Sequence, residues 1–250
     1  MTSIKPGLER QLRRQALWLR DSWLWLLEKH VLADGTCESR LKALDVGCGP
    51  GLVMEVLAPL FDLKGIDIDP GMVAEARGKG LDADAADAYS LPFGDDTFDV
   101  VYCSFLLLWV KDPVKVVSEM KRVSKDWVVC LAEPDFGGRI DHPESLSGLS
   151  RLIMEGIRKD GGDPLIGRKL RSVFDLCGLR AQLGVHAGVW DAERLRAESE
   201  DEWRWLEMTI PPDTETESLD GLRSAWSGAM AKGTLFQFNP IFYAFARKSA

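Results

Sequence analysis

The sequence predicts an α/β fold in which helices cover both faces of a mostly parallel, doubly wound sheet. Three apolar runs indicate it: one leads into a glycine-rich turn at 47–51, one ends in carboxylates at 63–69, and one is nearly unbroken over 100–108. A strand, a glycine turn and a helix in succession let the backbone approach a nucleotide-like ligand, because glycine has no side chain. A long apolar run is typical of a central parallel strand buried on both faces.

Composition narrows the class of protein. The 250 residues suffice for one domain with a large core, and the net charge of −8 disfavours nucleic acid as main partner. No apolar stretch approaches the ~20 residues of a membrane span. Charged residues interrupt every apolar run near the N-terminus, so we expect no signal peptide and a cytoplasmic protein.

The cysteines predict neither disulfides nor a metal centre. They are scattered and odd in number, four lie in or beside apolar segments, and no C-x-x-C or His/Cys cluster occurs. We therefore expect reduced thiols and no metal. The five are Cys37, Cys48, Cys103, Cys130 and Cys177.

The glycine turn departs from a dinucleotide-binding fingerprint at two positions. Leu52 stands where a third glycine is expected, and Asp45 stands where such strands are apolar. A carboxylate at 45 suits a positively charged ligand better than a pyrophosphate. The stretch ALDVGCGPGL at 43–52 resembles motif I of the class I S-adenosylmethionine-dependent methyltransferases.

This resemblance implies a Rossmann-like, doubly wound sheet of seven strands, mostly parallel, with an antiparallel last strand. It implies S-adenosylmethionine as methyl donor and S-adenosylhomocysteine as product. We expect one domain over 1–250, with four parts: an N-terminal helical cap at 1–34, the core at 41–188, a helical lid insert at 189–233 and the last strand at 234–250.

The resemblance also assigns cofactor-binding residues. An acidic residue roughly 20 positions beyond a glycine loop takes ribose hydroxyls, so Asp67 is expected at the ribose with Ile68 beside it, while Asp69 caps the next helix. The block from Asp87 to Val101 resembles the family's "D-A-x-x-L-P-F … F-D-V-V". It implies that Asp87 and the Ala88 N–H bind adenine. The motif I residues in this set are Asp45, Gly47, Cys48, Gly49 and Gly51.

The carboxyl end of the strand at 100–108 is expected to line the methyl-transfer site, because ligands of open α/β sheets bind at that edge. Ser104 and Phe105 lie there. Trp109 is either a wall for the sulfonium or a core tryptophan. Leu8–Leu32 predicts one helix, or two that meet near Asp21, and its aromatic half, with Trp23, either packs on the sheet or caps the pocket.

The polar loop at 132–143 follows the next strand and is also expected at the ligand edge. It places Glu133 and Arg139 there as candidates for binding the substrate. His142 is the histidine best placed to accept a proton, although we favour a surface position for it. The catalytic residue is otherwise left open.

Two later segments complete the expected acceptor site. Residues 161–168 resemble a "G-x-D-P-x-x-G-R" turn of relatives that modify small organic or quinone-like acceptors. Arg168 binds a substrate carboxylate or, as we favour, pairs with Asp163 or caps a helix. The insert that carries Trp203 and Trp226 is expected to close over the ligands.

The predicted function is methyl transfer to a small organic acceptor, by a monomer or homodimer. Proximity and orientation alone contribute on the order of 7–11 kcal/mol in favourable cases, so a dedicated base need not be visible. The alternatives are transfer to a protein side chain and a non-catalytic S-adenosylmethionine-binding subunit or sensor. A nucleic acid acceptor is disfavoured by the charge.

Overall fold

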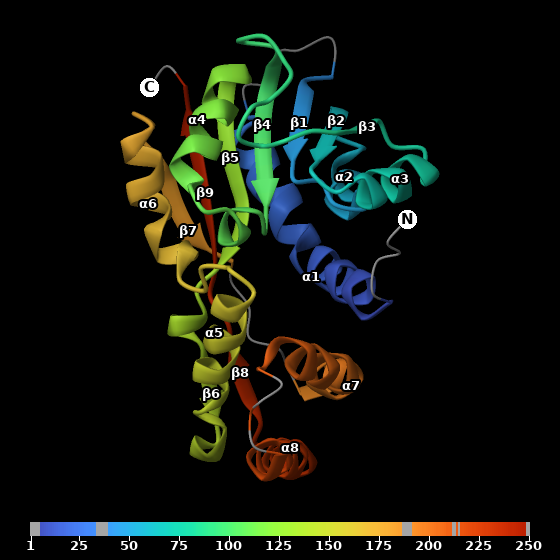
Figure 1. Cartoon of the computed structure of the whole chain (residues 1–250), viewed down its shortest axis with the longest axis vertical. Coiled ribbons are helices and arrows are strands. Elements are labelled where there is room, and N and C mark those ends of the chain that lie inside the picture. Colours follow the sequence, from blue (N-terminus) through green and yellow to red (C-terminus); the bar gives the residue numbers. More distant parts are fainter. Residues whose placement is uncertain (1–5, 34–39, 187–191, 212–213, 215, 249–250) are drawn as a thin grey trace.

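A seven-stranded sheet with the strand order β3-β2-β1-β4-β5-β9-β7 forms the centre of the molecule (Figure 1). The structure is a computed structural model that describes residues 6–33, 40–186, 192–211, 214 and 216–248. In this sheet β9 alone runs opposite to the other six strands, which confirms the predicted sheet. The strands are β1 Lys42–Val46, β2 Asp62–Asp67, β3 Ala83–Ala85, β4 Phe98–Ser104, β5 Ser124–Pro134, β7 Gln182–Val185 and β9 Ile241–Arg247.

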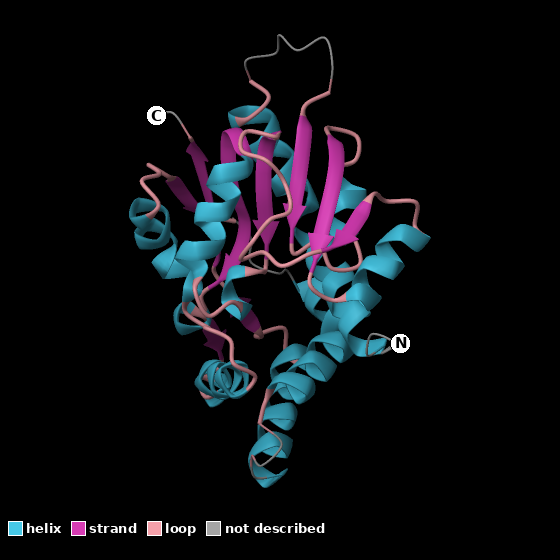
Figure 2. Cartoon of the chain, turned by 45° about the horizontal axis from the view of Figure 1, so that its top comes forward, coloured by secondary structure: helices cyan, strands magenta, loops and turns pink. Residues whose placement is uncertain are grey.

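Helices cover both faces of this sheet (Figure 2). On one face α4 (Pro113–Val123) and α6 (Ile166–Leu176) bury apolar side chains against β4 and β5. On the other face α1 (Pro6–His30) and α2 (Leu52–Leu57) do the same. The short α3 (Pro70–Gly78) packs beside β3, and Asp69 caps it by accepting from Gly71 N at 2.7 Å, as predicted.

Helix α1 is one continuous helix, which settles the alternative of two helices. Its buried positions recur every three or four residues, at Ala16, Leu19, Trp23 and Leu26. That spacing places them on a single face, which packs against the sheet.

A second layer extends beyond the carboxyl ends of the parallel strands (Figure 1). Its small core includes Trp203 and Trp226, whose rings meet edge to face with centroids 5.9 Å apart. Both tryptophans are buried in that core. The layer comprises α5 Leu149–Lys159, α7 Ala192–Thr209, α8 Thr216–Ala231, and a ribbon of β6 Ile140–His142 with β8 Phe236–Phe238.

Short 3-10 turns and one close contact shape the join between the layers. The turns are η1 (Leu107–Trp109), η2 (Phe136–Gly138) and η3 (Glu144–Leu146). A Cβ added at Gly156 of α5 would lie 1.6 Å from the Thr209 carbonyl oxygen. Only glycine therefore lets the end of α7 lie directly on α5. No described helix combines the length and apolar character that crossing a bilayer requires.

Candidate active site

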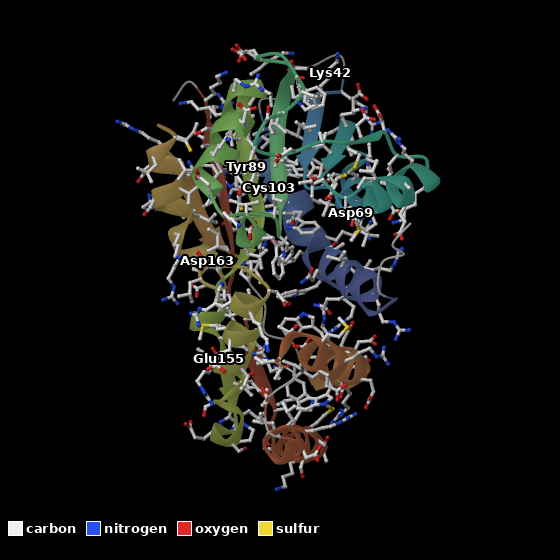
Figure 3. The ribbon with its side chains drawn as sticks, in the orientation of Figure 1. Lys42, Asp69, Tyr89, Cys103, Glu155 and Asp163 are labelled. Atoms are coloured by element: carbon white, nitrogen blue, oxygen red, sulfur yellow. The ribbon has the colours of Figure 1, made fainter. Side chains whose placement is uncertain are left out.

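A cavity of about 730 Å³ lies at the carboxyl ends of the central strands and is bordered by α1, α5 and α7. Small-molecule cavities commonly measure roughly 300–1,000 Å³. The strand order changes direction between β1 and β4, and open α/β sheets bind ligands at this switch point. Figure 3 shows Asp69 and Asp163 on opposite sides of this edge of the sheet.

The glycine loop forms one wall of the cavity through its backbone. Gly47, Gly49 and Gly51 have φ values of 78°, 52° and 80°, which L side chains rarely adopt. A Cβ at Gly49 would meet no atom within 4 Å, so this backbone faces open space. A Cβ at Gly51 would lie 2.3 Å from Leu81 Cδ1. Gly49 therefore permits close approach of a ligand, whereas Gly51 serves packing.

Asp67 lies at the end of β2 in the same cavity wall and is held by two backbone donors. Its Oδ2 accepts from Gly49 N at 2.8 Å, and its Oδ1 accepts from Asp69 N at 2.9 Å. Each carboxylate oxygen offers a second lone pair, so the group can still accept two hydroxyl hydrogen bonds. Ile68, beside it, is 73% exposed, an unusual state for a large apolar residue. These positions fit a ribose and a flat ring.

The turn that carries Asp87 and Ala88 lies next to the cavity rather than in its wall. Ala86 N donates to the Asp67 carbonyl at 2.9 Å, which joins this turn to the end of β2. The Asp87 carboxylate is exposed and accepts from Tyr89 N at 2.8 Å. Binding of adenine by Asp87 and Ala88 stays a prediction.

Asp45 lies behind the glycine loop and does not line the cavity. It is 1% exposed, and it is paired in register with Tyr102 of β4. Burial raises the pKa of Asp45 to about 8, and the nearby Asp67 carboxylate adds to the rise. Burial also raises the pKa of Cys48, which does line the cavity, so this residue stays a thiol. The expected contact between Asp45 and the cationic ligand stays a prediction.

The strand end at 104–105 and three acceptor candidates do line the cavity. Phe105 has a φ of 53°, held by a hydrogen bond from its N–H to the Ala132 carbonyl at 2.8 Å. The side chain of Arg139 is 3% exposed. The residues in question are Ser104, Phe105, Trp23, Trp109 and Arg139.

Three other candidates lie elsewhere, which corrects the sequence-based expectation. Glu133 is fully buried and accepts from Leu107 N at 2.6 Å and Leu108 N at 3.2 Å. Burial raises the pKa of Glu133 to about 8, although these amides oppose the rise. It therefore fixes η1 and cannot meet a ligand in the cavity. His142 is exposed on β6, whose alternation turns it away from the cavity wall.

Arg168 also has a structural role, because it forms an ion pair with Asp135. Its Nε lies 2.5 Å from Asp135 Oδ2 and its Nη2 lies 2.7 Å from Asp135 Oδ1. The expected partner, Asp163, instead pairs with Lys169 at 2.5 Å. Arg168 does not line the cavity, so it is not a substrate ligand here.

The side of the cavity away from the glycine loop includes an ion network that sequence reasoning missed. Glu202 of α7 lies between two arginines: its Oε2 is 3.2 Å from Arg14 Nη2 and its Oε1 is 3.8 Å from Arg139 Nη1. Arg139 also pairs with Asp141 at 2.9 Å, and Arg14 pairs with Glu198 at 2.5 Å. Arg14, Arg139 and Glu202 lie far apart in the sequence, so no local pattern predicts the network.

Aromatic side chains form much of the remaining wall. Trp205 of α7 lines the cavity and stacks on Phe136 with ring centroids 5.9 Å apart. Trp109 packs on Gly162, where a Cβ would lie 2.9 Å from its ring. Within the insert, Trp205 lines the cavity, while Trp203 and Trp226 belong to the core of the second layer. Closure of the insert over the ligands stays a prediction.

One group of described residues has the chemistry of metal ligands: Cys103, Cys130 and Glu133, with donor atoms within 4.8 Å of one another. All three are fully buried in the sheet core. Burial raises the pKa of Cys130, which disfavours the thiolate that binds a metal. This group packs the core.

Comparison with known proteins agrees with this geometry. Residues 44–130 match the model of a methyltransferase domain. A demethylmenaquinone methyltransferase of Renibacterium salmoninarum is 38% identical over 103 residues, which cover 38% of this chain and 44% of the relative. The chain spans about half the length of the curated relatives that it matches.

Two solved structures share the fold. A candidate methyltransferase of Bacillus halodurans C-125 has a TM-score of 0.59 at 18% identity, over 87% of this chain and 96% of that chain. Phosphoethanolamine N-methyltransferase 2 of Haemonchus contortus, in complex with S-adenosyl-L-methionine, has a TM-score of 0.55 at 17% identity, over 91% and 52%.

The residues present fit the cofactor of this family, S-adenosylmethionine. The open space at Gly49 admits a ligand against the backbone, and Asp67 keeps acceptor capacity for a ribose. The strand order, the glycine loop and the matched domain agree. Over 44–130 the chain therefore matches a methyltransferase domain, and its sheet has the Rossmann-like fold of the class I S-adenosylmethionine-dependent methyltransferases.

Proposed function

We propose that this chain transfers a methyl group from S-adenosylmethionine to a small organic acceptor. The observation that carries the proposal is the continuity of one cavity. The same space borders Gly49 and Asp67 on one side and Trp109, Arg139 and Trp205 on the other. A donor site and a helix-covered acceptor site therefore meet at the carboxyl end of β4.

The sulfonium supplies a methyl group that is already activated for displacement. A lone pair of the acceptor forms the new bond to carbon while the carbon–sulfur bond breaks, and its electron pair stays on sulfur. This chain's residues contribute orientation and exclusion of water: Asp67 and the glycine loop hold the donor, and Trp205 and Phe136 cover the acceptor. Orientation of this kind contributes on the order of 7–11 kcal/mol in favourable cases.

The shape of the site supports a small acceptor over a protein side chain. Helices α1 and α7 are joined over the cavity by Arg14 and Glu202, both largely buried. A cavity of about 730 Å³ has to hold the donor as well as the acceptor. The matched demethylmenaquinone methyltransferase also supports a ring-bearing acceptor.

Calorimetry with S-adenosylhomocysteine, followed by label transfer from methyl-labelled S-adenosylmethionine to a panel of small acceptors, tests the proposal. We expect binding, and transfer that depends on acceptor. Asp67→Ala is the negative control for both steps. Binding without transfer to any small acceptor or protein substrate favours the non-catalytic subunit, and absence of binding contradicts the proposal.

A further inference from the structure

Three buried polar atoms without a partner gather at one cavity. Among the described residues, six buried side-chain nitrogen or oxygen atoms have no hydrogen-bond partner of ordinary geometry, although Asp45 and Tyr102 interact with each other. Three of them belong to cavity-lining residues: Trp23 Nε1, Ser104 Oγ and Asn239 Oδ1. A buried polar group left without a partner costs roughly 1–3 kcal/mol, so native structures satisfy nearly all of them, some through water or ligand.

The other three atoms have a different setting. Asp45 and Tyr102 stand side by side on paired strands inside the sheet. Trp226 lies in the core of the second layer. None of these residues lines the cavity. Trp23, Ser104 and Asn239 therefore form a separate set, and what they share is a place in the cavity wall.

The three cavity atoms come from neighbouring elements. Ser104 ends β4, where it pairs with Ala132 of β5. Asn239 precedes β9, which begins opposite the end of β5. Trp23 of α1 packs in the same apolar cluster as Ala132 and Ile241. Together they form the floor of the cavity where β4, β5 and β9 meet.

Their hydrogen-bonding capacities differ. The Trp23 indole N–H can only donate, the Asn239 Oδ1 can only accept, and the Ser104 hydroxyl can do either. A group that satisfies all three must both accept and donate. A hydroxyl does this. A carboxylate has no proton to give to Asn239, and an ammonium has no lone pair for Trp23.

The charges around the floor also disfavour an anionic acceptor. Arg14 and Arg139 are the only described cationic residues that line the cavity, and both are paired with carboxylates. Asp141 holds Arg139 through two oxygens at 2.9–3.1 Å, and Glu202 lies between the two arginines. An anionic acceptor would have to break ion pairs that are largely buried.

We propose that Trp23, Ser104 and Asn239 are specificity-determining residues that receive the acceptor through an uncharged hydroxyl. This inference rests on the proposed function and adds the class of acceptor, a hydroxyl-bearing molecule. The aromatic walls at Trp109 and Trp205 suit a ring beside that hydroxyl.

Binding of matched naphthalene probes to the protein saturated with S-adenosylhomocysteine tests this inference. We expect 2-naphthol to bind at least tenfold more tightly than 2-naphthoate. Trp23→Phe, which removes the indole N–H, should weaken 2-naphthol about five- to tenfold, and Asn239→Leu should do the same. Trp226→Phe is the matched control, because it also removes a buried, unpartnered indole N–H but from a residue that does not line the cavity; it should leave binding unchanged.

Affinity for S-adenosylhomocysteine distinguishes a role of these residues in binding the acceptor from a role in binding the cofactor. It should stay within twofold of wild type in all three variants. A tenfold loss of affinity for S-adenosylhomocysteine in Trp23→Phe would assign the floor to the cofactor and overturn the inference. Equal affinity for 2-naphthol and 2-naphthoate, or no binding of 2-naphthol, would also overturn it. Failure of wild-type protein to bind S-adenosylhomocysteine would instead contradict the proposed function.

Discussion

The two sides of the cavity are built in different ways. The donor side uses backbone: three glycines with positive φ, and amides that hold the Asp67 carboxylate at 2.8–2.9 Å. All of it comes from 47–69. The acceptor side uses side chains from α1, the β5–β6 connection, α7 and the start of β9. Arg14 and Glu202, which join two of these elements, are 188 positions apart.

This contrast has an energetic counterpart. Backbone groups in a glycine turn are fixed by local conformation, so the donor side depends little on distant packing. The acceptor side depends on buried charges that are stable only while every partner is present. Changes on the acceptor side should therefore alter stability, and changes on the donor side should alter affinity.

The largest effect is expected for Arg139→Leu. It leaves Asp141, whose side chain is 1% exposed, without its cation. Removing one partner of a buried ion pair costs about 3–5 kcal/mol, so urea denaturation should show a loss of that size. Affinity for S-adenosylhomocysteine should stay within twofold. Arg10→Leu is the control: its pair with Asp201 joins α1 to α7 at 2.9 Å, but Arg10 is 58% exposed.

That exposed pair should contribute only about 0–1 kcal/mol to stability. Equal losses in Arg10→Leu and Arg139→Leu would mean that burial of the network is irrelevant. The distinction between the two sides of the cavity would then lose its energetic basis.

A smaller effect, on affinity rather than stability, is expected for Asp67→Ala. Loss of charge-assisted hydrogen bonds to the ribose should weaken S-adenosylhomocysteine by roughly 2–3 kcal/mol, about 30- to 150-fold. Asp69→Ala is the neighbouring control, because Asp69 caps α3 through Gly71 N. Its loss should lower stability by about 1 kcal/mol and leave affinity unchanged. Calorimetry that finds equal affinity in wild type and Asp67→Ala would place the ribose elsewhere.

The smallest effect is expected for Asp45→Asn, and it is a change in how the stability depends on pH. The folded carboxyl holds its proton up to a pKa of about 8, whereas the unfolded one releases it near 3.8. Between these values the folded chain binds the extra proton, so stability falls as pH rises. The variant lacks this titration. Its stability relative to wild type should rise by roughly 1 kcal/mol for each pH unit between 5 and 7.

Thermal and urea unfolding at several pH values measure this difference. Glu133, whose pKa is also raised to about 8 by burial, titrates in both proteins and cancels in the comparison. A difference that stays constant with pH would show that Asp45 is ionised in the folded protein at neutral pH.

The donor side could be predicted from sequence because its signals are local. The glycine spacing and the carboxylate after β2 fall within one strand-turn-helix unit and the next strand, and Asp67 and Gly49 lie where they were expected. The ribbon of β6 and β8 could not be found, because three-residue strands that pair Ile140 with Phe238 leave no periodic signal.

The residues on the acceptor side were harder to predict, because the type of a residue does not reveal in which direction its side chain points. Glu133 lies at the end of β5 and Arg139 follows it, yet Glu133 points into the core to hold two amides while Arg139 reaches the cavity wall. Arg168 pairs with Asp135, although Asp163 is closer to it in the sequence. Only the path of the chain between β5 and α6 decides which of the two carboxylates Arg168 meets. Cys37 lies outside the described residues.

The contact at Gly156 has a consequence for how this enzyme can diversify. A single methyl group there would push the carbonyl of Thr209, and with it the end of α7, away from α5. Because Trp205, Met208 and Thr209 all line the cavity, such a wedge would reshape the acceptor wall without touching the glycine loop. One substitution outside the cavity would thus change the wall proposed to contact the acceptor, while the wall proposed for the methyl donor stays the same.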